Sequence, residues 1–583
     1  MQPFSPRKIA VLGAGVMGTQ IACDLGDKGY SVHLYDMPGL AEKQLAAAVG
    51  NDLCSSTGVR RVVPVDSTGE NHPLLGEADW IVEAVFEEES AKEEINAIIG
   101  AHRNPEGVVT TNTSGLGINA MARSQSADFR AGYALSHFFN PVKALGLLEV
   151  CPVEGTDPDL YDAFCHFASH TIGKTVVHVR DTPNFVGNRI GGFALFLPFR
   201  LDTAELSVLD IDRICLCTVG WEPLKTWDIV GLPLAGPLGG NVYDRAPDDP
   251  RHEWWNPKVP EIETLIGQEL VGRKGRTRSG FLGMVEGQKT MYDFGGGEYV
   301  PARLSDFPSL RVAMDREAPS RQKIGALLSS EVDDAAARFA RGFFYSALAY
   351  GLQMVGEICD DIADIDTALK HGYNWPAGLF ERAQQVGLET CLQGMEAAGC
   401  GDMVPDWYRG IVAGGGQLYD VPAGTFYSWA GNRMDSLPTV AGGIYPEVLR
   451  KSTDNVLFAN DDAAVIDMSD DTGPVCLVEI TARALGHGPI EAGHRALDWA
   501  EQQQAAVVFG STGPHFGFGA DLHLFHQCSE DGDAQTISNL IRAGQELMQR
   551  LEYSSCPTVA AIQGLCLGGS SEWALACNRR VAN

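Results

Sequence analysis

The sequence predicts an α/β protein in which a helical region separates two sheet-containing regions. In residues 1–184, short apolar runs alternate with helical patterns, which is typical of a doubly wound parallel sheet. From residue 185 to about residue 400 the pattern is mainly helical and contains an internal repeat. From residue 453, strand patterns return and alternate again with helices. These three observations fix the expected fold class.

The first sheet is predicted from six apolar runs and two helical patterns. We expect helices at residues 16–28 and 90–102, each directly after a strand, which favours crossover connections between parallel strands. The strands are expected at KIAVLGAG, SVHLYD, WIVEAV, GVVTTNTS, AGYALSHF and LGLLEVCP.

A glycine motif follows the first strand. Gly13, Gly15 and Gly18 have GxGxxG spacing between the strand KIAVL and the first helix. Gly13 permits a tight turn, Gly15 leaves room for a pyrophosphate at the helix N-terminus, and Gly18 allows close packing of helix on strand. Asp36 ends the next strand, where its carboxylate can accept both ribose hydroxyls of NAD and would repel the 2′-phosphate of NADP. This pattern predicts a Rossmann-type NAD-binding domain.

The helical region contains a repeat with an offset of 154 residues. The tripeptide DID occurs at 210–212 and again at 364–366. Trp221 and Trp375 keep this offset, and so do Phe185 and Phe339. We therefore predict two related all-α domains, at residues 185–300 and 301–400.

The rest of the chain is predicted as a linker and a second α/β domain. Residues 401–452 are rich in glycine, tyrosine and proline without a sustained period, which indicates a linker, either extended or packed. Residues 453–583 contain strand patterns at AAVIDM, VCLVEI and AAVVFGS, and helical patterns near 490–503 and 535–552.

Composition excludes several classes of partner. The net charge of −31 argues against nucleic acid, which requires clustered lysine and arginine. No apolar run approaches the ~20 residues of a membrane span. The fourteen cysteines are scattered, without CxxC pairs, so we expect free thiols, no metal site and a cytoplasmic location.

His137, in HFFNP, is a candidate general base, although a lone histidine is more often a packed core residue. Its context is informative, because four motifs together resemble the L-3-hydroxyacyl-CoA dehydrogenases of fatty-acid β-oxidation. These motifs are LGAGVMG, TNTSGLGI, SHFFNPV with LLEV, and DTPNFVGNR. This resemblance covers residues 1 to about 400. It implies NAD-dependent oxidation of L-3-hydroxyacyl-CoA to 3-ketoacyl-CoA.

The resemblance also implies roles for particular residues. His137 and Glu149, twelve residues apart, would form the catalytic pair, with Ser114 and Asn188 as further catalytic positions. Glu87 and Lys92 match positions that contact the cofactor. An imidazole suits the reaction because its pKa lies near neutrality, and a carboxylate partner would orient and stabilise the imidazolium. In the second repeat Asn188 corresponds to Gly342, so we expect no catalytic residues there.

The C-terminal region resembles the crotonase family of enoyl-CoA hydratases and isomerases, through HFGFGADL and PTVAAIQGLCLGGSSEWALACNRRVA. The resemblance assigns the backbone N–H groups of Ala520 and Gly569 to an oxyanion hole, and Glu572 to the first catalytic glutamate. The sequence ends eleven residues after Glu572, before the position of the family's second glutamate. We therefore expect a partial crotonase-like domain without hydratase activity.

The expected partner is an acyl-CoA thioester, and the resemblance also allows a homo-oligomer or a complex with a thiolase. Three other interpretations stay open. The chain could be a related NAD-dependent hydroxy-acid dehydrogenase, an inactive homologue with a structural role, or a fragment of a longer bifunctional protein.

Overall fold

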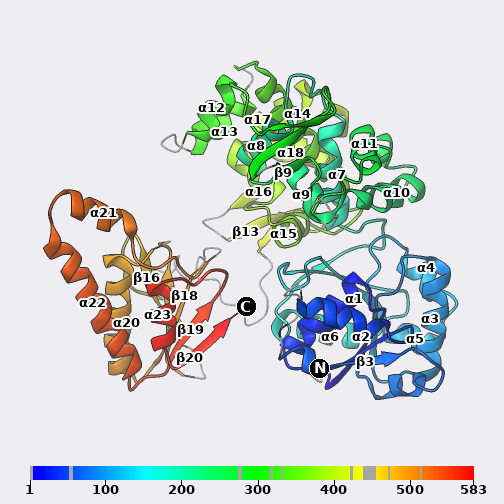
Figure 1. Ribbon diagram of the computed structural model, residues 1–583, viewed down its shortest axis with the longest axis horizontal. Coiled ribbons are helices and arrows are strands. Elements are labelled where there is room, and N and C mark those ends of the chain that lie inside the picture. Colours follow the sequence, from blue (N-terminus) through cyan, green and yellow to red (C-terminus); the bar gives the residue numbers. More distant parts are fainter. Residues whose placement is uncertain are drawn as a thin grey trace. The chain divides into compact units, whose positions relative to one another are not determined.

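The computed structural model describes residues 4–50, 55, 57–273, 279–285, 287–315, 320–329, 332–420, 424–437, 455–469, 473–482, 484–511 and 515–582. The chain divides into two compact units, Met1–Pro438 and Thr439–Asn583 (Figure 1). Residues 421–423 and 438–452 of the predicted linker, and the predicted boundary at 452/453, lie outside the described residues.

The first unit contains an eight-stranded sheet with the order β3-β2-β1-β4-β5-β6-β7-β8. Strands β1 to β6 pair in parallel in the order of dinucleotide-binding folds, which confirms the predicted fold class. Strand β7 runs antiparallel to β6, and β8 runs parallel to β7. The bounds are β1 Lys8–Leu12, β2 Ser31–Asp36, β3 Val62–Asp66, β4 Trp80–Glu83, β5 Val108–Thr111, β6 Tyr133–Phe138, β7 Leu147–Pro152 and β8 Thr175–His178.

Two of these strands, β3 and β8, were not predicted. They form the two edges of the sheet. β3 contains Pro64, and β8 has only four residues. Such short or proline-containing edge strands carry a weak periodic signal, because they need not bury two full faces.

Helices cover both faces of this sheet. Ile9 and Val11 of β1 belong to one buried cluster, and Ala10 and Leu12 to another, because successive side chains of a strand point to opposite faces. The helices are α1 Val16–Asp27, α2 Leu40–Gly50, α3 Glu89–His102, α4 Ile118–Ala122, α5 Ala127–Ala131 and α6 Pro158–His170.

The region after β8 is mainly helical, and its core is continuous with one face of the sheet. Its helices are α7 Gly187–Phe196, α8 Val208–Val219, α9 Pro223–Val230, α10 Ala235–Arg245, α11 Pro260–Gly267, α12 Pro308–Met314, α13 Ser320–Leu328, α14 Ala335–Met354, α15 Ile362–Tyr373, α16 Leu379–Val386, α17 Leu388–Ala397 and α18 Asp406–Ala413. Short 3₁₀ helices lie at Val59–Arg61, His72–Glu77, Leu197–Phe199, Leu232–Leu234, His252–Trp255 and Gly401–Met403.

Two small antiparallel sheets within this region were not expected from the sequence. One comprises β9 Leu282–Val285, β10 Gln288–Asp293 and β11 Glu298–Pro301. The other comprises β12 Tyr419–Asp420, β13 Thr425–Ser428 and β14 Arg433–Ser436. Strands of two to six residues between glycines give little periodicity, so the sequence alone does not reveal them. Because Phe426 and Tyr427 of β13 are buried, this part of the predicted linker is packed.

The internal repeat corresponds to two similar helix pairs, α7 with α8 and α14 with α15. Asp210 accepts the N–H of Ser207 at the start of α8 at 3.0 Å, and Asp364 accepts that of Asp361 at the start of α15 at 3.2 Å. Both helices end at a residue with left-handed backbone, Gly220 or Asn374.

A buried aspartate in each copy holds the start of a following helix. Asp212 accepts the N–H groups of Leu224 and Lys225 at 2.7 and 2.9 Å. Asp366 does the same for Phe380 and Glu381 at 2.9 and 2.8 Å. The repeat therefore reflects conserved local geometry within this chain.

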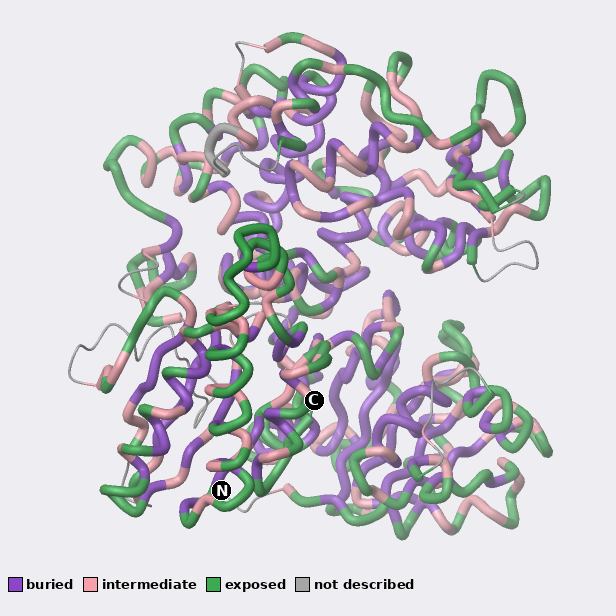
Figure 2. Tube along the Cα trace, turned by 60° about the vertical axis from the view of Figure 1, so that its left-hand side comes forward, coloured by how far each residue is buried: buried purple, intermediate pink, exposed green. Residues whose placement is uncertain are grey.

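The second unit has a six-stranded sheet in the order β15-β16-β17-β18-β19-β20. The strands from β17 to β20 are parallel, and β15 and β16 are antiparallel to their neighbours. Figure 2 shows the buried stretches along the chain in both units and the exposed residues on their outer sides. The bounds are β15 Val456–Ala459, β16 Ala463–Asp467, β17 Val475–Ile480, β18 Ala506–Ser511, β19 Thr558–Ile562, β20 Arg579–Ala582, α20 His487–Gln503, α21 Leu522–Glu530, α22 Ala534–Glu552 and α23 Gly569–Ala576.

Among the described residues, no helix is long and apolar enough to span a membrane. Among the described residues, no cysteine forms a disulfide bond. The same residues contain no cluster of three or more histidine, cysteine or acidic side chains that could hold a metal ion.

Candidate active site

His137 and Glu149 face each other across the antiparallel pair of strands β6 and β7. The register of β6 and β7 pairs these two residues directly, and Nδ1 of His137 lies 2.6 Å from Oε2 of Glu149. Both side chains are buried, with exposed fractions of 5% and 0%. Burial of a charged carboxylate is unfavourable unless hydrogen bonds replace its contacts with water, and the histidine N–H supplies one such bond. The other ring nitrogen, Nε2, is left to act on a ligand.

The second oxygen of Glu149 is held by the start of helix α7. The backbone N–H groups of Val186 and Gly187 donate to Oε1 at 3.0 and 2.6 Å. These N–H groups have no partner inside the helix, and the helix dipole favours a negative charge at this end. A side chain at Gly187 would lie 2.7 Å from the ring of Phe139, so glycine allows the close approach. The helical region thus fixes the carboxylate that orients His137.

Asn188, the next residue of α7, is partly buried. Its side-chain oxygen accepts a hydrogen bond of 3.0 Å from the hydroxyl of Tyr373, the last residue of α15. With Oδ1 occupied in this way, the amide NH₂ is the group that can donate to a ligand. Tyr373 was not predicted from the sequence, because a contact across 185 residues leaves no local pattern.

Ser114 lies in the loop after β5, next to the strand that carries His137. Within this loop, Asn112 accepts the N–H of Phe138 at 2.9 Å and so joins the ends of β5 and β6. The Ser114 hydroxyl donates to Glu87 at 3.3 Å. Ser114 and His137 therefore end at the same edge of the sheet, although no hydrogen bond joins them.

Glu87 organises this loop. Its Oε1 accepts from the hydroxyl of Thr113 at 2.6 Å and from the N–H groups of Ser114 and Gly115 at 2.8 and 3.0 Å. Burial opposes ionisation of Glu87, but the charge of Lys92 and these hydrogen bonds outweigh it and hold its pKa below the usual value. Glu87 is therefore a carboxylate that shapes the backbone around Ser114.

Lys92 is buried, with an exposed fraction of 1%, and lies between two carboxylates. Its Nζ is 2.8 Å from Glu83 Oε1 and 3.6 Å from Glu87 Oε2. Glu83 also accepts a hydrogen bond from the hydroxyl of Thr111 at 2.5 Å. This network connects β4, β5 and α3. Glu83 was not predicted from the sequence, because a glutamate at the end of an apolar strand resembles a solvent-exposed residue.

The three glycines of the first loop have distinct environments. Gly13 has φ of +101°, and a Cβ there would lie 2.5 Å from the carbonyl oxygen of Ala84. A Cβ on Gly18 would lie 1.8 Å from the carbonyl oxygen of Gly13. Gly15, directly before α1, has no atom within 4 Å of the position of a Cβ. The loop is therefore closely packed on the protein side and open at the helix N-terminus, which fits the pyrophosphate of a dinucleotide.

Asp36 lies at the end of β2, beside this loop. Its Oδ2 accepts the N–H of Ala14 at 2.5 Å, and its Oδ1 accepts the N–H of Met37 at 2.7 Å. These bonds fix the carboxylate, while each oxygen retains a second lone pair for a ribose hydroxyl. The residues present therefore fit NAD.

The second unit brings together the backbone groups predicted for an oxyanion hole. A Cβ on Gly569 would lie 3.9 Å from the amide nitrogen of Ala520, so the two segments are neighbours. The N–H of Gly519 donates to the hydroxyl of Ser570 at 3.1 Å and joins the two loops. Gly569 is the first residue of α23, and Glu572, in the first turn, is exposed.

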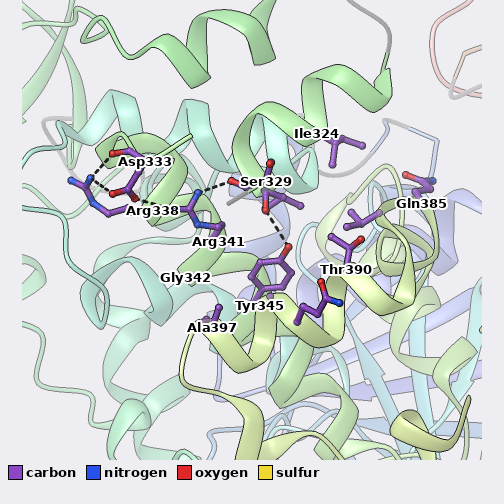
Figure 3. Close-up of a pocket in the computed structure, with 16 residues that line it drawn as sticks. Ile324, Ser329, Asp333, Arg338, Arg341, Gly342, Tyr345, Gln385, Thr390 and Ala397 are labelled. Carbon is purple, nitrogen blue, oxygen red and sulfur yellow. Dashed lines mark hydrogen bonds and ion pairs between the residues drawn. The ribbon is translucent and has the colours of Figure 1, made fainter. Parts of the chain in front are cut away.

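A cavity of about 620 Å³ lies in the helical region, between α13, α14, α16 and α17 (Figure 3). Arg338, Arg341, Gly342 and Tyr345 line it from α14. The arginines are paired with acidic groups, since Arg338 contacts Glu205 at 2.7 Å and Arg341 contacts Asp333 at 3.1 Å. The cavity contains none of the predicted catalytic or cofactor-binding residues.

Three segments of the chain match known families. Residues 8–182 match the NAD-binding domain of 3-hydroxyacyl-CoA dehydrogenase, and residues 339–412 match the C-terminal domain of that enzyme. Residues 481–583 match the enoyl-CoA hydratase/isomerase family.

Similar proteins support the same assignment. A probable 3-hydroxyacyl-CoA dehydrogenase of Bacillus subtilis is 31% identical over 607 residues, which cover 98% of this chain and 75% of that protein. A putative fatty acid oxidation complex trifunctional enzyme of Rickettsia felis is 23% identical, over 99% of this chain and 77% of its own length. The crystal structure of 3-hydroxybutyryl-CoA dehydrogenase from Escherichia coli has the same fold, with a TM-score of 0.52 and 19% identity over 70% of this chain and 98% of that chain.

Three findings lead to one assignment: the pair of His137 and Glu149 on β6 and β7, the glycine loop after β1, and the relative that matches nearly the whole chain. The chain belongs to the 3-hydroxyacyl-CoA dehydrogenase family, with an NAD-binding domain at its N-terminus and an enoyl-CoA hydratase/isomerase domain after the helical region.

Proposed function

We propose that this chain oxidises L-3-hydroxyacyl-CoA to 3-ketoacyl-CoA in fatty-acid β-oxidation, with His137 as the general base. The observation that carries this proposal is the buried pair of His137 and Glu149, 2.6 Å apart and held from the other side by the start of α7. Bound NAD supplies the acceptor for the hydride that leaves the substrate carbon.

His137 takes the proton of the substrate hydroxyl at Nε2. Its Nδ1–H donates to Glu149, which fixes the tautomer in which Nε2 carries the free lone pair. As the imidazolium forms, Glu149 stays ionised and stabilises the new charge. The two N–H groups of α7 keep this carboxylate from rotating away.

Ser114 and Asn188 are proposed to hydrogen-bond the reacting oxygen or His137. Asn188 has its NH₂ free for this purpose, because its Oδ1 accepts from Tyr373. Gly13, Gly15, Gly18 and Asp36 are proposed to bind NAD. Glu87 and Lys92 are proposed to act at the cofactor through the loop that contains Ser114.

The experiment that tests this function is NADH oxidation with acetoacetyl-CoA and with a long-chain 3-ketoacyl-CoA, in wild type and in His137→Gln. We expect the variant to lose a factor of at least ~100 in kcat, the low end for a general base, while NADH still binds. A folded wild type that binds NADH and turns over neither substrate would contradict the proposal. It would favour a related hydroxy-acid dehydrogenase or an inactive homologue.

A second function is favoured by the neighbouring amides of Ala520 and Gly569. We propose that they bind the carbonyl oxygen of an acyl-CoA thioester, with Glu572 beside the hole. Calorimetry with crotonyl-CoA and with its thioether analogue, which lacks the carbonyl, tests this on the fragment 439–583. We expect the thioether to bind at least ~10-fold more weakly, since two hydrogen bonds are lost. Equal affinities would contradict the proposal.

Organisation and partners are proposed on the same basis. We propose domains at residues 1–184, 185–300, 301–400 and 453–583, joined by a linker at 401–452. A cytoplasmic location is proposed because the cysteines of the described residues are not joined in disulfide bonds. A homo-oligomer or a complex with a thiolase is tested by gel filtration of the chain alone and with a purified thiolase.

A further inference from the structure

Tyr373 connects the second helical repeat to the active site of the first. It is the last residue of α15, and its hydroxyl lies 3.0 Å from Oδ1 of Asn188 on α7. Its ring lies against Gly191, where a Cβ would be 2.4 Å from the ring. The rings of Phe139 and Trp221 contact it edge-on, with centroids at 6.3 and 6.0 Å. The ring is therefore packed against Gly191, Phe139 and Trp221, which restricts the direction of its hydroxyl.

The repeat provides an internal comparison. Because the two copies are offset by 154 residues, the contact of α15 with α7 corresponds to the contact of α8 with α14. At the corresponding positions, Val219 stands for Tyr373 and Gly342 stands for Asn188. Gly342 borders the cavity between Arg341 and Tyr345 (Figure 3).

The contact of α8 with α14 thus lacks both the tyrosine and the asparagine. This contact also has no counterpart of His137 or Glu149 beside it. A tyrosine needed only to fill space between helices would have no reason to be lost together with the asparagine. Simple packing of the two copies explains the ring of Tyr373, but it does not explain this joint difference.

We propose that Tyr373 is a positioning residue for the dehydrogenase reaction, holding the amide of Asn188 so that its NH₂ points to the reacting oxygen. This inference rests on the function proposed above. Burial, together with the charge of Glu149, raises the pKa of Tyr373 well above its usual value, so the hydroxyl stays a neutral donor across the working pH range. The second repeat thereby contributes one group to a site whose other residues come from the first repeat and the NAD-binding domain.

The test is Tyr373→Phe, which keeps the ring and removes the hydroxyl. We expect kcat for 3-ketoacyl-CoA reduction to fall about 5-fold, the effect of one lost hydrogen bond, with the KM for NADH unchanged. The matched control is Tyr345→Phe, which removes a buried hydroxyl that donates to Leu328 on the side without a catalytic pair. This control should keep the wild-type kcat. A Tyr373→Phe variant with wild-type kcat would overturn the inference.

A double-mutant cycle separates positioning from packing. If Tyr373 acts through Asn188, then Tyr373→Phe should cause no further loss of kcat in an Asn188→Ala background. A loss of the same factor in both backgrounds would show that the hydroxyl acts elsewhere and would overturn the inference. If Tyr373→Phe melts at a lower temperature, the same cycle is measured at a temperature at which circular dichroism shows all four proteins to be folded. Absence of turnover in the wild type would instead contradict the proposed function itself.

Discussion

At the scale of single residues, Glu149 has the most demanding position in the site. Its two oxygens serve different partners, His137 on one side and the first amides of α7 on the other. A fully buried carboxylate with three donors is fixed in orientation, so it can hold the imidazole in one tautomer. Replacing Glu149 tests whether its charge or only its shape is required.

We expect Glu149→Gln to lower kcat by on the order of 10²–10⁴-fold, with the KM for NADH unchanged. The carboxamide oxygen would accept from Val186 and Gly187, which turns the NH₂ toward Nδ1 of His137. Nδ1 must then accept, the ring proton moves to Nε2, and the base is lost. Steady-state kinetics of NADH oxidation measure the effect. A variant within a few-fold of wild type would show that the carboxylate charge has no part in the reaction.

At the scale of elements, two glycines at the start of α1 are expected to serve different purposes, one in cofactor binding and one in folding. We expect Gly15→Ala to leave the melting temperature unchanged and to raise the KM for NADH at least ~10-fold, since its Cβ meets no protein atom but would occupy the phosphate position. Gly18→Ala is the matched comparison, because its Cβ would collide with the carbonyl oxygen of Gly13. It should cost about 1–3 kcal/mol or more of stability. Equal effects of both variants on stability would contradict this reading of the loop.

The buried aspartates of the helical repeat predict a pH dependence of stability. Burial raises the pKa of Asp212 to about 8, against the donated N–H groups of Leu224 and Lys225, which lower it. An unfolded aspartate loses its proton near pH 4. Between about pH 4 and about pH 8 the folded state therefore holds a proton that the unfolded state has lost. The contribution of Asp212 to the free energy of unfolding is complete below about pH 4 and is lost as the pH rises through about 8.

We therefore expect the melting temperature of the helical region to fall between pH 5 and pH 8.5 in wild type, and to fall less in Asp212→Asn. Thermal unfolding followed by circular dichroism at several pH values measures this. Asp202→Asn, which changes an exposed aspartate, is the control and should keep the wild-type pH profile. Identical profiles for Asp212→Asn and wild type would show that Asp212 does not titrate in this range.

At the scale of the whole molecule, the two units have separate cores and separate candidate sites. Each contact of the dehydrogenase site described above lies within residues 1–437. We expect a fragment ending at residue 437 to reduce acetoacetyl-CoA with a kcat/KM within about 2-fold of the complete chain, as is typical of domains that fold independently. A large loss in the fragment would show that residues 438–583 contribute to the site.

The sequence by itself determined the features that depend on local pattern. The GxGxxG loop, Asp36 at a strand end and the alternation of strands and helices predicted the first sheet and its cofactor, and the family match confirms both. The resemblance around HFFNP identified His137 and Glu149 as a pair. Their catalytic role is still a prediction. The 154-residue offset identified two helix pairs with the same capping geometry. These features can be recognised in the sequence because they depend on short or periodic patterns.

Only the tertiary structure decided how distant groups meet. The antiparallel turn of β7 brings Glu149 opposite His137, and the start of α7 completes the carboxylate's hydrogen bonds. Tyr373 reaches Asn188 from the other repeat, and Glu83 compensates the buried charge of Lys92. The contacts of Tyr373, Glu83 and the start of α7 have no local pattern, because chain connectivity constrains neighbours in sequence, whereas burial of charge and packing of helices select partners across the whole fold.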